Sequence, residues 1–425
     1  MSASMSTRRS SSTIHRLPFS KICFFPYLFD SQTRDAPRGG FIMRCRKSKT
    51  SSLPLSLVDL YRELKKKRKK EATTISERDL TAKEQQLIRR IQAMTAEQNE
   101  NNVTRTTAYL DFYLRHREIH WAFLGHMVSR NGGWNMTDLK GELLMRLLSE
   151  DDRQSFFAFL ERGNWLIFQD IYPQFLLYEE SKKRGEPLFY LLPWLGVSTF
   201  METVWHHFWR HGDPYTLAIA LVVNEQSYLE SRVIQHPAFR QTVFQTLEFK
   251  LQELLCFNHI LFPHDDGRGG TALIGQTLHE FESLHERILL GKRLYSILFD
   301  DEETLENAVR WAVRHPHTGS RKDYWPQLFN DVCESFPREP YRRRIHDCQI
   351  VPNAPRLYSP QLRHAWKNVV HEAVEPGDWF TDPHVVRYLV KPERPTNGEI
   401  VDAYCETLEK MELAIIAKHA FFHAR

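Results

Sequence analysis

The sequence has few cysteines and none of the spacings that indicate a disulfide framework or a zinc site. Six cysteines occur among 425 residues, at positions 23, 45, 256, 333, 348 and 405. No two of them form the C-x-x-C pair that structural zinc sites use. Disulfide-rich scaffolds are typically short secreted chains with a high cysteine content. We therefore expect a reduced, cytoplasmic protein with incidental thiols.

The sequence also has no apolar run long enough to cross a bilayer. The longest stretch without a charged residue is PLFYLLPWLGVSTFM (187–201), and Pro193 interrupts it. A membrane-spanning helix needs ~20 consecutive apolar residues. We predict a buried helical segment here and no transmembrane segment.

Motifs of nucleotide-dependent and hydrolytic enzymes are missing as well. FPHDDGRGGT (262–271) is glycine-rich, but it has neither the GK[ST] ending of a P-loop nor the GxGxxG spacing of a dinucleotide fingerprint. No GxSxG occurs, which excludes the nucleophile motif of the α/β-hydrolases. We predict a flexible surface loop at 262–271 and no cofactor.

Signals for β-strands are scarce, and helical spacing dominates from about residue 100. Apolar residues recur at intervals of three and four in TRTTAYLDFYLRH (104–116) and EIHWAFLGHMVSR (118–130). No Asn-Gly or Asp-Gly pair is flanked by alternating apolar residues, as a β-hairpin would require. Prolines become denser from about residue 313. These patterns predict an all-α fold, a multi-helix globular bundle with a loop-richer C-terminal third.

Glycines predict four helix boundaries in this region. The Asn-Gly-Gly sequence in RNGGWNM (130–136) is typical of the left-handed backbone that ends a helix. We predict a corner between two helices there, with Trp134 packed against the core, and we also keep Trp134 as a candidate binding residue. Gly163 or Asn164 is predicted to end the helix that begins after Ser149, and Gly185 to end the helix that follows. Gly212 is predicted to end a further helix, with Asp213 as the cap of the next one.

Positive charge is concentrated near the N-terminus. Residues 43–70 carry eleven basic and two acidic side chains, whereas residues 71–425 carry 40 basic and 49 acidic side chains. The change of composition predicts three parts. These are an N-terminal extension at 1–42, a basic and partly helical arm at 43–98, and a helical domain at 99–425 that could divide again near residue 313.

The N-terminal extension is rich in serine and arginine and has no acidic residue before Asp30. Two explanations stay open. It is a targeting segment such as a transit peptide, or translation of the natural protein begins at Met43. Mass spectrometry of the natural protein would exclude the second explanation if it found peptides from residues 1–42.

The densest charge in the chain is a basic run, which consists of Lys65, Lys66, Lys67, Arg68, Lys69 and Lys70. Such a run can bind anionic lipid headgroups or nucleic-acid phosphates. Runs of like charge are also commonly solvated arms without a partner. No aromatic side chain lies within the run, which disfavours stacking on bases.

Histidines and a carboxylate in one helical segment supply candidate catalytic residues. METVWHHFWRH (201–211) places Glu202 and His206 four residues apart, and His207 and His211 four residues apart. Each pair therefore shares one helix face. Glu202 and His206 are candidates for acid–base chemistry, and the three histidines are candidate metal ligands. The segment lacks the HExxH pattern, and histidines near a helix C-terminus also suit the helix dipole.

Other candidates are polar residues in apolar or aromatic surroundings. Asp170 follows WLIFQ, and Glu225 follows LAIALVVN. A carboxyl group in such a helix is hydrogen-bonded, paired or shifted in pKa, and an interhelical polar contact explains it without a catalytic role. HTGSRKDYWPQLF (317–329) places Arg321 and Asp323 beside Trp325, which either form a pocket or anchor a loop.

Long blocks of the sequence resemble one known family. NNVTRTTAYLDFYLRHREIHWAFLGHMVSRNGGWNMTDLK (101–140), NWLIFQDIYPQFLLYEES (164–181), NEQSYLESRVIQ (224–235) and SRKDYWPQLFN (320–330) are similar to the YppC-like proteins. These form a bacillar family classed as a domain of unknown function. The resemblance covers roughly residues 50–400 and leaves out residues 1–42. It implies a bacterial source and supplies no catalytic residues.

The sequence leaves the function unknown and supports three hypotheses. The leading one is a cytoplasmic helical protein that acts through partner proteins, because every enzyme motif lacks a defining element. The second is an enzyme with an acid–base or metal site on helical residues, with Glu202, His206, Glu225, Arg321 and Asp323 as candidates. The third is a protein that binds the membrane surface or a nucleic acid through residues 65–70.

Overall fold

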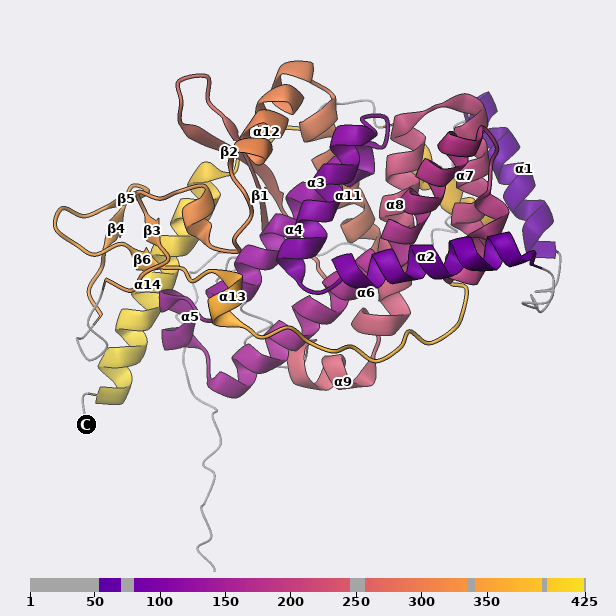
Figure 1. Cartoon of the computed structure of the whole chain (residues 1–425). Coiled ribbons are helices and arrows are strands. Elements are labelled where there is room, and N and C mark those ends of the chain that lie inside the picture. Colours follow the sequence, from indigo (N-terminus) through magenta and orange to yellow (C-terminus); the bar gives the residue numbers. More distant parts are fainter. Residues whose placement is uncertain (1–52, 70–79, 245–256, 335–340, 392–395, 424–425) are drawn as a thin grey trace, which may run out of the picture. The chain divides into compact units, whose positions relative to one another are not determined.

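The structure is a computed structural model that describes residues 53–69, 80–244, 257–334, 341–391 and 396–423. The predictions about residues 1–42 and Met43 lie outside these residues, as does Lys70. Within the described residues the longer helices are α1 (Leu55–Lys69), α2 (Ala82–Gln98), α3 (Asn102–Arg115), α4 (His120–Asp138), α6 (Glu150–Arg184), α7 (Thr199–His211), α8 (Pro214–Leu229), α11 (Leu284–Phe299), α12 (Glu302–Arg314) and α14 (Val401–His423) (Figure 1). Short helices are α5 (Glu142–Leu147), α9 (Pro237–Phe239), α13 (Leu362–Ala365), η2 (Phe189–Leu195), η3 (Glu230–Ile234), η4 (Arg240–Phe244), η5 (Arg321–Asp323) and η6 (Pro383–Leu389). The strands are β1 (His259–Asp265), β2 (Thr271–Thr277), β3 (Phe329–Asn330), β4 (Ile345–His346), β5 (Gln349–Ile350) and β6 (Leu357–Tyr358).

Helix α8 is the centre of the helical packing, because α4, α6, α7 and α11 all contact it. Its apolar run from Leu217 to Val223 is at most 1% exposed at every position. A helix that is apolar on all sides must be covered on all sides, and the four neighbouring helices provide that cover. No helix among the described residues is both long and apolar enough to cross a bilayer.

Two of the four predicted helix boundaries at glycines are confirmed, because α6 ends at Gly185 and α7 at Gly212, both in the left-handed conformation. The other two are wrong. Helix α4 runs without interruption from His120 through the Asn-Gly-Gly sequence to Asp138, and α6 runs through Gly163 to Arg184. In α4 the reason is close packing, since a methyl group on Gly133 would collide with Asn102 Oδ1 and His317 Nε2. The glycine therefore permits contact with neighbouring segments and does not end the helix.

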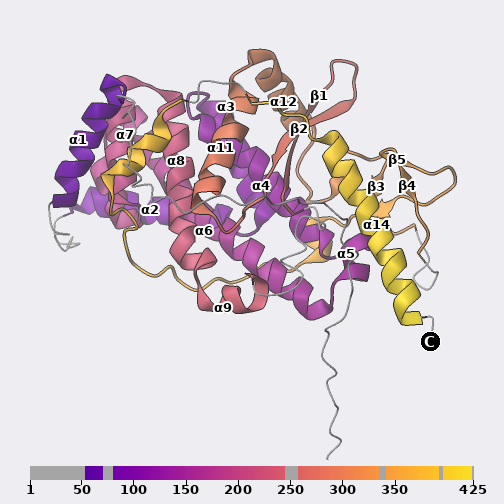
Figure 2. The same ribbon diagram turned by 180° about the vertical axis from the view of Figure 1, so that it is seen from behind.

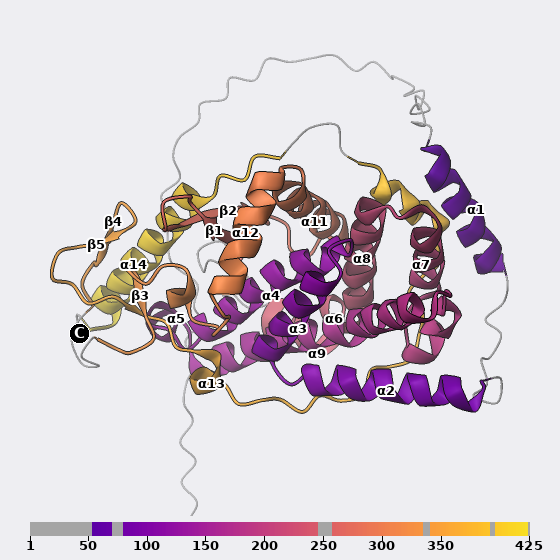
Figure 3. The ribbon, with the colours of Figure 1, turned by 45° about the horizontal axis from the view of Figure 1, so that its top comes forward.

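The prediction of a mainly helical chain is confirmed, but the chain also contains β-structure. Strands β1 and β2 form an antiparallel hairpin that packs against α12 (Figure 3). β3 pairs with β6 in parallel, and β4 pairs with β5 antiparallel. Half of the predicted loop at 262–271 is therefore strand. Only residues 266–270 connect the two strands, and Asp266 Oδ1 accepts hydrogen bonds from the amides of Arg268 and Gly270, both at 2.8 Å.

Helix α1 packs against α7 and η6 (Figures 1 and 2). Leu57, Leu60 and Leu64 are spaced by three and four residues, and each is at most 3% exposed. These leucines form the apolar stripe with which α1 contacts the helices behind it. The exposed face of α1 carries part of the basic run.

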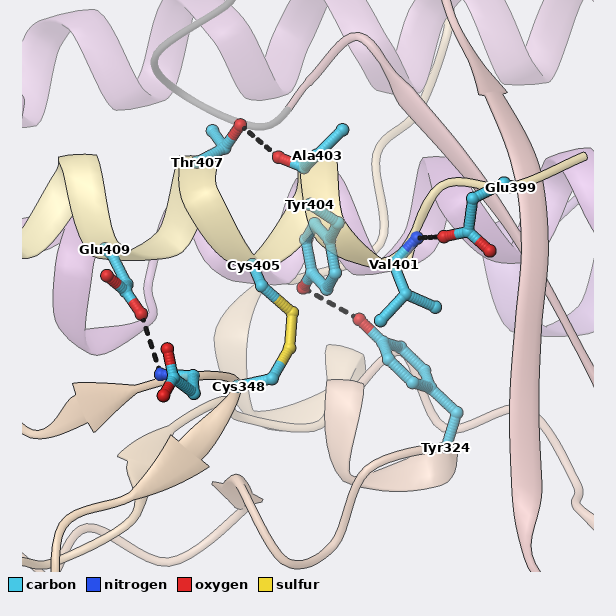
Figure 4. The surroundings of a disulfide bond; sticks show 10 residues. Tyr324, Cys348, Glu399, Val401, Ala403, Tyr404, Cys405, Thr407 and Glu409 are labelled. Carbon is cyan, nitrogen blue, oxygen red and sulfur yellow. Dashed lines mark hydrogen bonds between the residues drawn. A yellow bond between two sulfur atoms is a disulfide. The ribbon is translucent and has the colours of Figure 1, made fainter.

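A disulfide joins Cys348, in the turn between β4 and β5, to Cys405 of α14 (Figure 4). The expectation that the thiols are incidental is therefore wrong for these two residues. Their Cα atoms are 5.3 Å apart, although 57 positions separate them in the sequence. The sequence offered no signal for this pairing, because it depends on how α14 packs against the C-terminal loops.

Candidate functional site

A cleft of about 1040 Å³ lies between α1, α6, α7, α8 and residues 374–378, and we call it the α7 cleft. Its lining combines apolar side chains with many ionisable ones. The latter are Glu63, Lys66, Lys67, Asp170, Glu202, His206, Arg210, Tyr228, Arg232, Glu375 and Asp378. A large concave surface with several polar groups is the usual setting of a small-molecule site.

Asp170 on α6 is the buried carboxyl group of the α7 cleft, with an exposed fraction of 3%. Its Oδ2 accepts hydrogen bonds from Asn224 Nδ2 and from Gln174 Nε2, the latter at 3.1 Å. Its Oδ1 is buried and has no hydrogen-bond partner in the described part of the chain. Burial raises the pKa of Asp170 to about 7, although the hydrogen bond from Asn224 and the charge of Arg232 oppose the shift.

Asn224 fixes the position of this carboxyl group. Its own Oδ1 accepts hydrogen bonds from Ser198 Oγ at 2.8 Å and from Trp379 Nε1 at 2.9 Å. These two donors orient the amide so that its Nδ2 faces Asp170. The interhelical polar contact that explains a carboxyl group in an apolar helix is thus present between α6 and α8. This contact provides a hydrogen bond to Oδ2 of Asp170, whereas Oδ1 receives none from the described residues.

Arg232, in η3, holds residues 374–378 against the end of α8. Its Nη2 donates to the carbonyl oxygen of Gly377 at 2.9 Å and to that of Glu375 at 3.3 Å. Its guanidinium group also lies over the ring of Tyr228, 4.1 Å from the ring centroid. Arg232 therefore forms one wall of the cleft and places a positive charge near Asp170.

Two ion pairs form the edge of the cleft between α1 and α7. Lys67 Nζ lies 2.5 Å from Glu202 Oε1. Arg210 forms two hydrogen bonds to Glu63, at 2.9 and 2.8 Å. His206 lies beside them, and burial lowers its pKa even though Glu202 opposes the shift. The predicted pair Glu202 and His206 therefore lies in the cleft, with Glu202 already paired and His206 neutral at pH 7.

The three candidate metal ligands of α7 are divided between two places. The rings of His207 and His211 lie 4.3 Å apart, whereas His206 packs against Phe189 with ring centroids 5.4 Å apart. Burial lowers the pKa of His207, and the proximity of His211 lowers it further. Within the described residues no group of three or more His, Cys, Asp or Glu side chains is arranged to hold a metal ion.

Arg321 and Asp323 belong to a different cluster. Arg321 is 3% exposed, and its Nε donates to both oxygens of Asp138, at 2.9 and 2.7 Å. Arg321 also donates to the Tyr324 hydroxyl, which lies 2.9 Å from the Tyr404 hydroxyl (Figure 4). Asp323 accepts hydrogen bonds from the amide and hydroxyl of Thr318. These contacts join α4, η5 and α14 and lie outside the α7 cleft.

The two candidate tryptophans lie next to this cluster. Trp134 is completely buried, with its ring 4.7 Å from that of Tyr324 and 6.0 Å from that of His317. Trp325 is 8% exposed, and its ring lies 5.5 Å from that of Tyr404. Trp134 therefore packs α4 against the C-terminal third, and Trp325 packs within that third.

Glu225, the remaining candidate, lines a separate cavity of about 220 Å³ among α3, α4, α6, α8 and α11. Burial raises the pKa of Glu225 to about 8, against hydrogen bonds from Gln226 and Trp121. The five predicted catalytic residues thus occupy three places. Only Glu202 and His206 meet in the α7 cleft.

The residues of the basic run differ in their exposure and in their contacts. Lys65, Lys66 and Arg68 are exposed on α1, and Lys66 lines the α7 cleft. Lys67 is half-buried in its ion pair with Glu202. The side chain of Lys69, like Lys70, lies outside the described residues.

Sequence reasoning identified some cleft residues and missed others. Asp170 has a signal in the sequence, because a carboxyl group within an apolar helix requires a special environment. Asp378 lies in a polar and aromatic stretch that could form a pocket, but Arg232 has no signal, since nothing local relates it to Asp170. Asp378 accepts a hydrogen bond from the amide of Thr199 at 2.8 Å and so caps α7 from a segment far away in the sequence.

Comparison with known proteins agrees with the resemblance predicted from the sequence. Residues 97–405 match the model of a family described as a protein of unknown function, DUF2515. The uncharacterized protein YppC of Bacillus subtilis (strain 168) is 37% identical over 330 residues, which cover 76% of this chain and 94% of that relative. No solved structure matches the chain. The chain therefore belongs to the DUF2515 family of proteins of unknown function.

Proposed function

We propose that the protein binds a small polar molecule in the α7 cleft and recognises it through Asp170. The observation that carries this proposal is the buried carboxyl group of Asp170, whose Oδ1 has no hydrogen-bond partner in the described part of the chain. A buried polar atom without a partner is costly, and a ligand that supplies a hydrogen bond removes that cost. The volume of about 1040 Å³ is sufficient for a molecule of the size of a metabolite.

The chemistry of the cleft defines the class of ligand. With a pKa of about 7, Asp170 is present in both its protonated and its ionised form near neutral pH. It can therefore accept a hydrogen bond from a hydroxyl or amino group and can also donate one. Most other charges of the cleft are engaged, since Lys67, Arg210 and Arg232 have protein partners. This arrangement favours a neutral or weakly basic ligand that carries hydroxyl or amino groups.

Acid–base catalysis on that ligand is a second candidate function. The observation in its favour is the pKa of Asp170, because proton transfer is most efficient when the pKa of the catalytic group lies near the working pH. His206 is neutral in the same cleft and could serve as a second proton acceptor.

A further candidate role is attraction to an anionic surface through the basic run. Lys65, Lys66 and Arg68 are exposed, and each cation near an anionic membrane contributes about 1 kcal/mol to binding. We propose a cytoplasmic protein that contacts anionic lipid through this face of α1. Binding to phosphatidylserine vesicles should weaken with salt and be lost when these three residues are changed to glutamine. Equal binding by the variant would contradict this role, and equal binding to DNA would favour a nucleic-acid partner.

The α7 cleft can be tested with a defined panel of amino acids, amino alcohols, amines and sugars. Thermal unfolding of the full chain is followed with each compound. We expect at least one compound to raise the melting temperature of the wild type, because a ligand that binds only the folded state stabilises it. The same compound should have no effect on the Asp170→Asn variant.

Glu225→Gln is the matched control, since it also replaces a buried carboxylic acid by an amide but lies in the separate cavity. It should retain the shift seen with the wild type. A compound that stabilises the wild type and Asp170→Asn equally would show that Asp170 does not recognise it, and this would refute the proposal.

A further inference from the structure

The cavity that contains Glu225 lies in the interior of the helical part, apart from the α7 cleft. Helices α3, α4, α6, α8 and α11 surround it, and its lining is mainly apolar. Large rings and aliphatic side chains such as Trp121, Leu124, Val222 and Leu294 are each at most 3% exposed and form much of this lining. Its volume of about 220 Å³ exceeds the roughly 150 Å³ of an engineered apolar cavity that binds benzene.

Two glycines in the lining allow the surrounding helices to pack closely. A methyl group on Gly125 would collide with the ring of Trp121, and one on Gly291 would collide with Val222. Gly125 therefore leaves room for an indole ring over α4, and Gly291 allows α11 to approach α8. The wall of the cavity is thus built from close helix contacts, which fix its dimensions.

Most polar groups of the lining are already engaged by other protein groups. Arg105 is paired with Glu161 at 2.5 Å. Arg287 donates to Gln226 at 2.9 Å and also pairs with Glu230. Carboxylates therefore balance the charges of both cations, which disfavours an acidic ligand, although Arg105 Nε has no hydrogen-bond partner among the described residues.

Glu225 is the polar group of the lining that suits a ligand. Gln226 Nε2 donates to its Oε1 at 3.1 Å, and the Trp121 indole also donates to its carboxyl group. Because burial raises the pKa of Glu225 to about 8, the group is mostly protonated at pH 7 and has a hydrogen to donate.

We propose that this cavity binds a small, mainly apolar, uncharged molecule, whose single hydrogen-bond acceptor, such as a ketone or ester carbonyl, is held by Glu225. The apolar lining favours the body of the ligand, and the protonated carboxyl group favours its carbonyl end. A buried donor that meets one acceptor in apolar surroundings gives selectivity for the position of that acceptor. The inference concerns a second site and does not depend on the function proposed for the α7 cleft.

The size of the site is tested by calorimetric titration of the full chain with methyl esters from butanoate to dodecanoate. The affinity of the wild type should rise about fourfold for each added methylene until the cavity is full and then fall. Val128 lines the cavity and is half-buried, so Val128→Phe should move this limit to a shorter ester. Val103→Phe is the control, because Val103 is equally half-buried on α3 but lies outside the lining.

If Val128→Phe does not fold, Ile167→Phe serves in its place, since Ile167 is a half-buried lining residue of α6. Affinity that rises to dodecanoate without a limit, and equally in all variants, would indicate nonspecific partitioning. That result, or the absence of binding by every ester, would overturn the proposal.

The polar contact is tested by comparing 2-octanone with 1-octene. The wild type should bind the ketone more tightly than the alkene. In Glu225→Leu the ratio of the two affinities should be about threefold to tenfold smaller, because one neutral hydrogen bond contributes about this factor. Glu225→Gln keeps a donor of the same shape and should keep the preference. A preference that is the same in the wild type and in Glu225→Leu would show that Glu225 does not hold the ligand.

Discussion

Asn224 donates a hydrogen bond to Asp170 at the α7 cleft, whereas Glu225, the next residue along the chain, lines the separate apolar cavity. Consecutive residues of a helix point in directions about 100° apart, so neighbours can serve different cavities. The two carboxyl groups are also close enough for the charge of Asp170 to raise the pKa of Glu225 further. Helix α8 therefore separates two sites of different polarity.

The raised pKa of Asp170 predicts how stability depends on pH. The group binds its proton more tightly in the folded chain, so the folded state is favoured at low pH and loses this advantage as the pH rises from about 4 to about 7. The shift from 3.8 to about 7 corresponds to about 4 kcal/mol. Asp170→Asn carries no such charge and should be more stable than the wild type at pH 8 by up to this amount.

Urea unfolding at pH 5 and pH 8 measures this difference. The advantage of Asp170→Asn should be larger at pH 8 than at pH 5. If the free energy of unfolding of Asp170→Asn differs from that of the wild type by the same amount at pH 5 and at pH 8, Asp170 is already ionised at pH 5.

Two of the glycines at which we predicted helix boundaries form a matched pair of tests. Gly133→Ala should destabilise the fold by about 1–3 kcal/mol, because the added methyl group would collide with Asn102 and His317. Gly163→Ala should stabilise it by about 0.5–1 kcal/mol, since nothing lies within 4 Å of the added group and alanine favours the helix. Chemical unfolding of both variants checks the signs. A stabilising effect of Gly133→Ala would contradict the close packing described for α4.

The ion pair of Arg321 and Asp138 should be costly to break. Arg321→Met leaves the half-buried carboxylate of Asp138 without its buried partner, and breaking a buried pair costs about 3–5 kcal/mol. Arg210→Met removes an exposed ion pair with Glu63 and should cost at most about 1 kcal/mol. Equal losses in the two variants, measured by denaturant unfolding, would argue against the buried position of Arg321.

The disulfide predicts a dependence of stability on the redox state. Cys405→Ser, or reduction of the wild type, should lower the free energy of unfolding by about 2–4 kcal/mol, because the bond closes a loop of 57 positions. Thermal unfolding with and without reductant checks this, and alkylation followed by mass spectrometry identifies the bonded cysteines. A wild type whose Cys348 is alkylated without prior reduction would contradict the pairing.

The helices could be predicted from the sequence because their apolar residues follow a period of three and four, and so could the ends of α6 at Gly185 and of α7 at Gly212. The continuation of α4 through Gly133 and of α6 through Gly163 could not. At Gly133 the close approach of Asn102 and His317 requires a residue without a side chain inside the helix, and the sequence does not show that approach. The hairpin of β4 and β5 was also missed. Its turn residues, Asp347 and Cys348, both adopt positive φ angles, which Asn-Gly usually supplies.

The candidate site was predictable only in part for a similar reason. Glu202 and His206 were found because they are four residues apart on one helix. Asp170, Arg232 and Asp378 approach one another from three distant segments, so their relationship is a property of the packing. Arg321 and Asp323 have the residue types of a catalytic site, but their hydrogen bonds are those of a structural cluster.

The ionisation of Asp170 can be followed by an NMR titration of its carboxyl carbon in the full chain, with Asp170→Asn identifying its signal. We expect a midpoint near pH 7, because the carboxyl group is buried and only one of its oxygens is hydrogen-bonded. A midpoint near the ordinary aspartate value of about 3.9 would contradict it, since Asp170 would then be an ionised structural residue.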